Sequence, residues 1–283
     1  MSLRNDRKKF KSIRFVGVSL CGGKTNKSAL ACIEYFPDQK KIFLSHLESQ
    51  ISNSSLSGDE KIHKFVSEKP YPIESVAFDV PLNLPKCLRC KLKCPGYETC
   101  EVDEVKWLRK HYSEWNKKKR PRRSFTPYTE RCAEFFLAHY LEEKFLTSHA
   151  LGANLAPLTA RALFIKRRLK TQTIEVNTSI SLWRLGRSLG IQKSYLRQYK
   201  HSVEGVSIRK TLLDKLQDKN VAFLYAQDIK IMINNSQAFD AFLCALTGVL
   251  NFLGECEKRP KGYPKNEGWV SIPIQEVKAN FNS

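Results

Sequence analysis

The sequence predicts an α/β fold, and three observations lead to this class. Apolar residues form strand-like runs in some segments and recur at helical spacing in others, so strands and helices follow one another along the chain. Three strand-like runs near the N-terminal end lie close enough together for an antiparallel meander. Hydrophobic residues make up 42% of the 283 residues and aromatic residues 11%, which provides a sizeable core and excludes global disorder.

The first part of the chain should form four strands and one helix. The strands are predicted at residues 14–20, 28–35, 41–47 and 75–79. A short helix should begin near Ser57, because Ile62, Phe65 and Val66 recur at helical spacing after it. The fourth strand is an apolar run that Pro81 stops, since proline cannot continue a paired strand.

Helices dominate the second part of the chain. Helices are predicted at residues 129–145, 156–169, 180–189, 207–216 and 237–253, and short strands at residues 173–176 and 269–272. Thr129 is the expected cap of the first of these helices. Residues 110–128 resemble a flexible or inserted segment more than a regular element.

A cysteine-rich stretch follows the fourth strand, which ends in Asp79. Its spacing, C-x2-C-x3-C-x5-C, is formed by Cys87, Cys90, Cys94 and Cys100. Four thiolates this close in sequence can converge on one ion, and zinc is the usual occupant of such a closed, structural site. A disulfide pair and an iron–sulfur cluster are the alternatives, but the total of nine cysteines is odd, and the spacing differs from the ferredoxin patterns.

The charge of the chain predicts a polyanionic partner. Lys and Arg number 48 against 28 Asp and Glu, which gives a net charge of +20. Basic clusters occur at residues 86–93, 117–123 and 166–170. Nucleic acid is the favoured partner, and an ordinary basic surface is the alternative. Nearby aromatic residues such as Trp115 could stack on bases, although most aromatic residues belong to a core.

The sequence also predicts a soluble, cytoplasmic protein with no membrane partner. The apolar run at residues 15–20 is too short for the core of a signal peptide. No stretch approaches the roughly 20 apolar residues that a membrane span needs.

Three acids lie among apolar neighbours, where a carboxylate usually needs a partner, a proton or a metal ion. Asp79 ends the fourth strand, Glu175 lies inside the strand at residues 173–176, and Asp240 lies early in the long helix at residues 237–253. Asp240 could instead compensate a helix dipole, and Glu175 could be an edge-strand carboxylate that faces water.

An ordered set of short motifs extends over most of the chain, from residue 15 to about residue 273. The set comprises residues 17–24, residues 78–85 with the cysteines, residues 126–131, Glu175-Val176 and residues 239–242. In this set the sequence resembles the predicted nucleases of the RNase H-like fold, specifically the domain-of-unknown-function family 429. The resemblance implies a single domain over residues 1–283, with a five-stranded mixed sheet flanked by helices and a cysteine-rich, basic insertion at residues 85–128.

The resemblance further implies that Asp79, Glu175 and Asp240 bind Mg2+ or Mn2+. Ser19 stands where the family's first strand normally carries Asp, so one negative charge of the expected site is missing.

The expected activity is metal-assisted hydrolysis of phosphodiester bonds in DNA or RNA. Lys24, Arg123 and Arg131 are candidates for binding the phosphates. The alternative is a catalytically degenerate protein of the same fold that binds nucleic acid without cleaving it.

Overall fold

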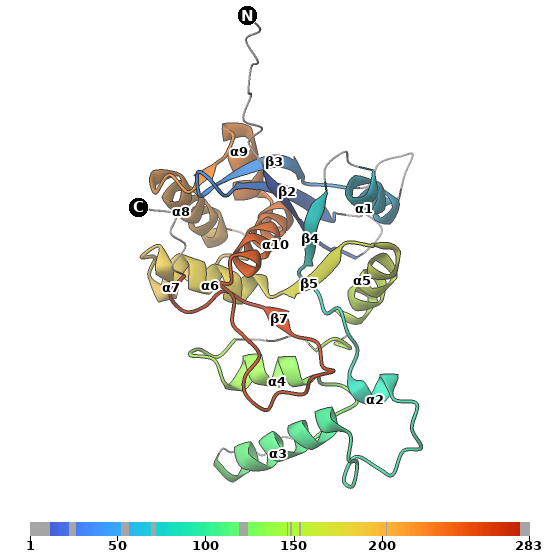
Figure 1. Ribbon diagram of the computed structural model, residues 1–283. Coiled ribbons are helices and arrows are strands. Elements are labelled where there is room, and N and C mark those ends of the chain that lie inside the picture. The colour runs from blue at the N-terminus through green and yellow to red at the C-terminus, as the bar shows by residue number, and fades with distance from the viewer. Residues whose placement is uncertain are drawn as a thin grey trace, which may run out of the picture.

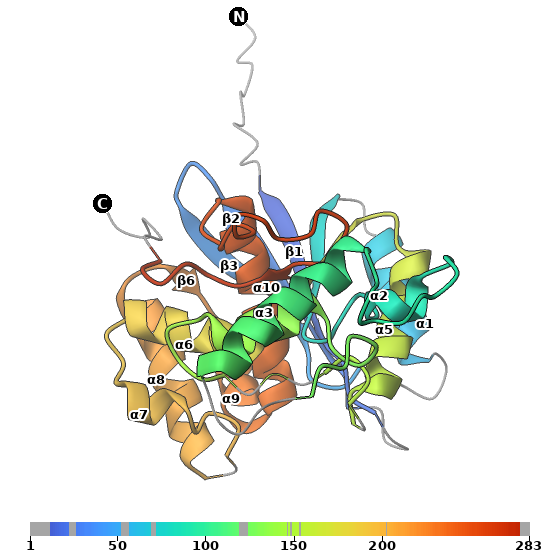
Figure 2. The ribbon, with the colours of Figure 1, turned by 90° about the horizontal axis from the view of Figure 1, so that it is seen from below.

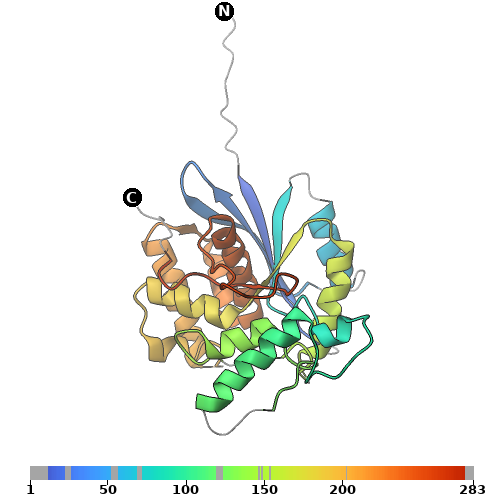
Figure 3. The ribbon, with the colours of Figure 1, turned by 60° about the horizontal axis from the view of Figure 1, so that its bottom comes forward.

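A mixed sheet of seven strands, in the order β6-β3-β2-β1-β4-β5-β7, forms the centre of the protein (Figure 1). The computed structural model describes residues 12–22, 27–51, 57–68, 72–118, 124–145, 147, 149–152, 154–201 and 203–277. Helices flank the sheet on both faces, which confirms the predicted α/β class (Figure 3).

The strands combine an antiparallel meander with parallel neighbours. The bounds are β1 Ile13–Ser19, β2 Ala29–Phe36, β3 Lys41–Glu48, β4 Ile73–Phe78, β5 Gln172–Val176, β6 Ala222–Phe223 and β7 Val270–Ser271. β2 pairs antiparallel with β1 and β3, whereas β4 runs parallel to β1 and β5 runs parallel to β4. β6 and β7 extend the sheet at its two edges, so the described sheet has two more strands than the five expected.

The two faces of the sheet bury different helices, because successive side chains of a strand point to opposite faces. Phe15 packs with one set of helices, α6 (Thr178–Ser188), α8 (Glu204–Asp218), α9 (Ala226–Asn234) and α10 (Ser236–Phe252). Val16, the next residue, packs with α1 (Gly58–Ser67) and α5 (Ala156–Arg168) on the other face. The sheet is thus a middle layer between two helical layers.

Close packing of α10 against β1 depends on a glycine. A Cβ atom at Gly17 would lie 2.0 Å from the backbone oxygen of Ala241 and 2.4 Å from the backbone nitrogen of Ala245. No other residue type fits at these distances without a shift of the helix. Gly17 therefore sets how near α10 comes to the end of β1.

Four further helices lie away from the sheet or at its border. They are α2 (Lys86–Arg89), α3 (Asp103–Lys118), α4 (Cys132–His139) and α7 (Lys193–Leu196). α3 lies on the far side of α4 from the sheet and crosses in front of the molecule when it is viewed from below (Figure 2). None of the helices in the described part of the chain combines the length and the apolar character needed to cross a bilayer.

Several sequence expectations need correction. Residues 110–118 belong to the helix α3 and do not form a flexible segment, and residues 119–123 lie outside the described residues. The helix expected at residues 129–145 covers only Cys132–His139. Thr129 does not cap it, because its hydroxyl donates to the backbone oxygen of Thr126 at 3.0 Å.

Candidate functional site

A cavity of about 270 Å³ lies at the sheet edge where β1, β4 and β5 end. Parallel strands bring their carboxyl ends to the same edge, so residues distant in sequence meet there. Ser19 is the last residue of β1, Asp79 directly follows β4, and Glu175 lies near the end of β5. Asp240 reaches the cavity from α10, and Lys200 also lines it. The structure therefore brings all four predicted residues of the acidic site to one cavity.

Asp79 is held by two hydrogen bonds from β1 and its extension. The Ser19 hydroxyl donates to Oδ2 of Asp79 at 2.6 Å, and the backbone N–H of Leu20 donates to Oδ1 at 3.1 Å. Burial and the negative charge of Asp240 nevertheless raise the pKa of Asp79 to about 6. Ionised Asp79 is thus destabilised by its surroundings, and a cation in the cavity would relieve this.

Asp240 is 4% exposed and contacts two consecutive residues. The Tyr199 hydroxyl donates to Oδ1 at 3.2 Å, and Nζ of Lys200 lies 3.1 Å from Oδ2. Burial works against the charge of Lys200, but Asp240, Tyr199 and Asp79 outweigh it and raise the pKa of this lysine. We call Asp79 and Asp240 the acid pair, and Lys200 is the cation that offsets their charge.

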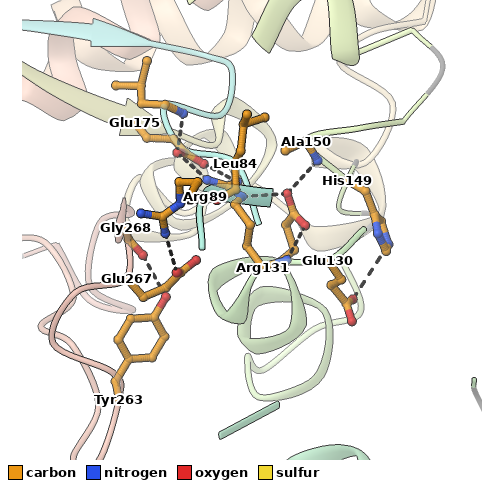
Figure 4. A network of polar contacts seen from close by, with 12 residues as sticks. Leu84, Arg89, Glu130, Arg131, His149, Ala150, Glu175, Tyr263, Glu267 and Gly268 are labelled. Atoms are coloured by element: carbon orange, nitrogen blue, oxygen red, sulfur yellow. Dashed lines mark hydrogen bonds and ion pairs between the residues drawn. The ribbon is translucent and has the colours of Figure 1, made fainter. Parts of the chain in front are cut away.

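Glu175 lines the same cavity, but both of its carboxylate oxygens are already bonded. Arg131 donates from its two terminal nitrogens at 2.8 Å and 2.7 Å, and the backbone N–H of Leu82 donates at 2.8 Å. Figure 4 shows this contact from close by. With 7% of Glu175 and 2% of Arg131 exposed, the contact is a buried bidentate ion pair. Glu175 therefore joins β5 to the start of α4.

Glu134 completes the network around Arg131. Its Oε2 accepts from the backbone N–H of Arg131 at 2.9 Å, and its Oε1 accepts from Nε of the same arginine at 2.9 Å and from the N–H of Ala150 at 2.7 Å. The first contact is half of a capping box at the start of α4. Glu134, three residues after the cap residue Arg131, was the available sequence signal. It was missed because arginine is not among the residues that usually cap a helix.

The predicted phosphate-binding residues have different outcomes. Lys24 and Arg123 lie outside the described residues. Arg131 is buried and bonded to two glutamates, which leaves its guanidinium unavailable for an incoming phosphate. Sequence reasoning missed Lys200, a cation that lines the cavity and whose side chain is 55% exposed. It lies in an irregular segment after α7, where no periodicity marks it.

The residues described here contain no group of three or more His, Cys, Asp or Glu side chains that is arranged to hold a metal ion. At the acidic site, the carboxylate oxygens of Glu175 are bonded to Arg131 and Leu82. The acid pair remains, and carboxylate oxygen is the donor that Mg2+ prefers. Mg2+ commonly uses one or two carboxylates together with water and phosphate oxygens, so the acid pair fits this ion without a third carboxylate from Glu175.

The four cysteines of the predicted zinc site are all free thiols. Cys87, Cys90, Cys94 and Cys100 all line one cavity of about 720 Å³ beside α2. Burial and the other three thiols raise the pKa of Cys87, so the four groups share one electrostatic environment. Their donor chemistry fits zinc, but in the described geometry the sulfurs are not gathered around a common centre.

A buried acid attaches the cysteine-rich stretch to the body of the protein. Arg89 of α2 donates to Oε2 of Glu267 at 3.1 Å, as Figure 4 shows. Glu267 is 2% exposed, and burial raises its pKa to about 7. Arg89 and Glu267 therefore tie α2 to the segment before β7.

No family model matches the chain, and neither the curated proteins nor the solved structures include a match. The geometry of the acid pair is therefore the basis for assigning a function.

Proposed function

We propose that the protein is a metal-dependent nuclease of the RNase H-like class that hydrolyses phosphodiester bonds in nucleic acid. The observation that carries this proposal is the acid pair, Asp79 and Asp240, at one cavity where three strands of the sheet end. The raised pKa of Asp79 supports it, because two like charges held close together favour a bound cation.

The strand arrangement supports the same class. An antiparallel meander of β1 to β3 is followed by two parallel strands, β4 and β5. Asp79 directly follows β4, and Glu175 lies near the carboxyl end of β5. A long helix with a further acid, α10, packs across β1. This order of elements agrees with the resemblance to the predicted nuclease family.

Asp79 and Asp240 would hold Mg2+ or Mn2+. When bound, the metal ion would activate water and stabilise the charge of the leaving oxygen. Ser19 lies beside the ion position but adds no charge, and it keeps Asp79 in place through the 2.6 Å hydrogen bond. Glu175 acts instead as a structural anchor, because its oxygens are committed to Arg131 and Leu82.

Lys200 is the residue that would contact the substrate phosphate. Its ammonium group is a compact point charge on a flexible stem, and more than half of the side chain is exposed. The net charge of +20 favours a nucleic-acid substrate over a small neutral one. Arg131 would serve catalysis only indirectly, by positioning β5.

We also propose a structural zinc ion at Cys87, Cys90, Cys94 and Cys100. The four thiols would have to close around the ion, and the cavity between them provides the room. Thiols that remain unpaired fit a reducing, cytoplasmic compartment. Elemental analysis of the purified protein tests this, with about one zinc per chain expected.

Cleavage assays with Mg2+, Mn2+ and EDTA test the nuclease proposal. Asp79→Asn should abolish cleavage, and Asp38→Asn in the exposed turn before β3 is the matched control that removes the same charge elsewhere. Ser19→Asp should raise both activity and metal affinity, because it adds a third carboxylate next to Asp79. An inert wild type together with an inert Ser19→Asp variant, on DNA and RNA alike, would refute the proposal.

The second candidate function is a non-catalytic protein that binds nucleic acid. Two observations favour it: Ser19 carries no charge, and Lys200 already neutralises Asp240 at 3.1 Å. This candidate predicts binding whose log K falls about linearly with log salt, without cleavage under any metal condition.

A further inference from the structure

A second cavity, of about 800 Å³, adjoins the cavity of the acid pair. Ser179 lines both cavities. Tyr199 lines the second one while its hydroxyl donates to Asp240 in the first. A molecule held in the second cavity would therefore lie next to whatever occupies the first.

Aromatic side chains from several elements converge on this second cavity. They are Trp115 of α3, His139 of α4, Phe145, Trp183 of α6, and Tyr199, and we call the space between them the aromatic cavity. The Trp115 and His139 rings lie 4.2 Å apart between centroids, and Phe145 meets the ring of Trp183 edge-on at 5.9 Å. Such an aromatic lining suits flat, unstacked rings.

The charges around the aromatic cavity suit a polyanion. Lys193 and Arg197 both pair with Glu143, at 3.1 Å and 2.7 Å, and both lie over the ring of Trp183. Glu142 is paired with Arg184 at 2.9 Å. The two glutamates of the lining are thus already neutralised.

The exposed cations can reach an incoming phosphate. The side chain of Arg197 is 64% exposed and that of Lys193 is 55% exposed, so each can turn from Glu143 towards solvent. Lys144, which lines the cavity, is exposed as well. Positive charge therefore surrounds the entrance to a cavity that is itself aromatic.

We propose that the aromatic cavity binds unpaired nucleobases beside the phosphate at the acid pair, so that the substrate is single-stranded nucleic acid. This inference rests on the proposed function, because it places the scissile phosphate at Asp79 and Asp240. Bases within a duplex are stacked and paired, and they would have to be extruded from the stack before they could enter. Single strands offer their rings directly, and stacking on aromatic side chains tolerates any sequence.

Binding of fluorescent oligonucleotides in EDTA tests the proposal without cleavage. A single strand should bind more tightly than the duplex of the same sequence. Trp115→Ala should weaken single-strand binding about five- to a hundredfold, with little change for the duplex. Trp115→Phe should retain most of the affinity, because a ring remains, and the melting temperature of each variant checks its fold. Tyr225→Ala is the matched control, since Tyr225 is 55% exposed and lies outside the aromatic cavity.

Arg197→Ala provides a separate electrostatic readout. If Arg197 contacts phosphate, its loss should reduce the slope of log K against log salt by about 1. An unchanged slope together with unchanged affinity would count against the cationic entrance.

Equal affinity for single strand and duplex, or a folded Trp115→Ala variant that binds as wild type does, would overturn the inference. A similar loss in Tyr225→Ala would also overturn it, since the effect would not be specific to this cavity. Cleavage distinguishes this failure from failure of the proposed function. Metal-dependent, Asp79-dependent cleavage of duplex alone would refute the single-strand inference and leave the nuclease intact. Trp115-dependent single-strand binding without cleavage under any metal would support the aromatic cavity and refute the nuclease.

Discussion

Removing the charge of Asp79 should change the stability of the protein in a way that depends on pH. Burial and Asp240 raise the pKa of Asp79 from its usual 3.8 to about 6 in the metal-free protein. The folded chain therefore holds this proton more tightly than the unfolded chain does. As the pH rises from about 4 to about 6, ionisation of Asp79 costs the folded state free energy, and the cost remains at higher pH.

The size of this cost follows from the two pKa values. Each tenfold difference in proton affinity is worth about 1.4 kcal/mol, so the interval between 3.8 and about 6 corresponds to about 3 kcal/mol. Asp79 is only partly buried and borders an open cavity, and solvent screening reduces the cost to about 2 kcal/mol. The Asp79→Asn variant carries no charge at any pH and avoids this cost.

Urea unfolding in EDTA measures the effect. The free energy of unfolding of Asp79→Asn, relative to wild type, should increase by about 2 kcal/mol between about pH 4 and about pH 7.5. Asp38→Asn, in an exposed turn, is the control for loss of one negative charge. A difference between Asp79→Asn and wild type that stays constant with pH would refute the claim that Asp79 is held against ionisation. A relative loss of stability at high pH would refute it more strongly.

Three further predictions concern the packing and charges of the site. Gly17→Ala would place a Cβ atom 2.0 Å from a backbone oxygen of α10. It should therefore destabilise the protein by about 1–3 kcal/mol in urea unfolding and lower metal-dependent activity. Unchanged stability would contradict the close packing of α10 against β1. Glu175→Gln should lower the free energy of unfolding by about 3 kcal/mol, because it weakens a buried ion pair with Arg131. The control Glu74→Gln, at an exposed position of β4, should lower it little. Normal stability of Glu175→Gln together with lost metal binding would instead identify Glu175 as a metal ligand. Lys200→Met should raise the pKa of Asp79 further, because Lys200 lowers it in wild type, and it should make added Mg2+ stabilise the protein more than it stabilises wild type, as measured by thermal melting. An equal or smaller Mg2+ effect would show that Lys200 does not offset the charge of the acid pair.

The main strands were predictable because each contains a run of apolar residues long enough to show its period. β6 was not predicted, since it has two residues and depends on β3, the strand that it extends, whereas β7 lies within the strand predicted at residues 269–272. α3 was missed for another reason. It carries many charged residues outside a narrow apolar stripe, and its basic end resembled a flexible segment.

The candidate site was predictable in part. Asp79 stood out because a strand ends at it, and Asp240 because it is an acid within an apolar helix. Glu175 was likewise an acid among apolar neighbours, but in a strand. Its partner Arg131 lies 44 residues away in the sequence, so their ion pair could be recognised only in the folded structure. Lys200 had no local signal, because its importance comes from its distance to Asp240.

By itself, the sequence determined the α/β class, the position of the acids at the ends of apolar strands, the cysteine spacing and the positive charge of the chain. These properties depend on periodicity and composition, which are local. Only the tertiary structure decided that Asp79 and Asp240 face the cavity without an arginine partner, whereas Glu175 forms a structural ion pair with Arg131. Ser19 and Asp79, for example, are 60 residues apart and meet because β1 and β4 are parallel neighbours. Hydrogen bonds and ion pairs form between groups that folding brings within reach. The role of a buried carboxylate therefore depends on which side chain folding places beside it.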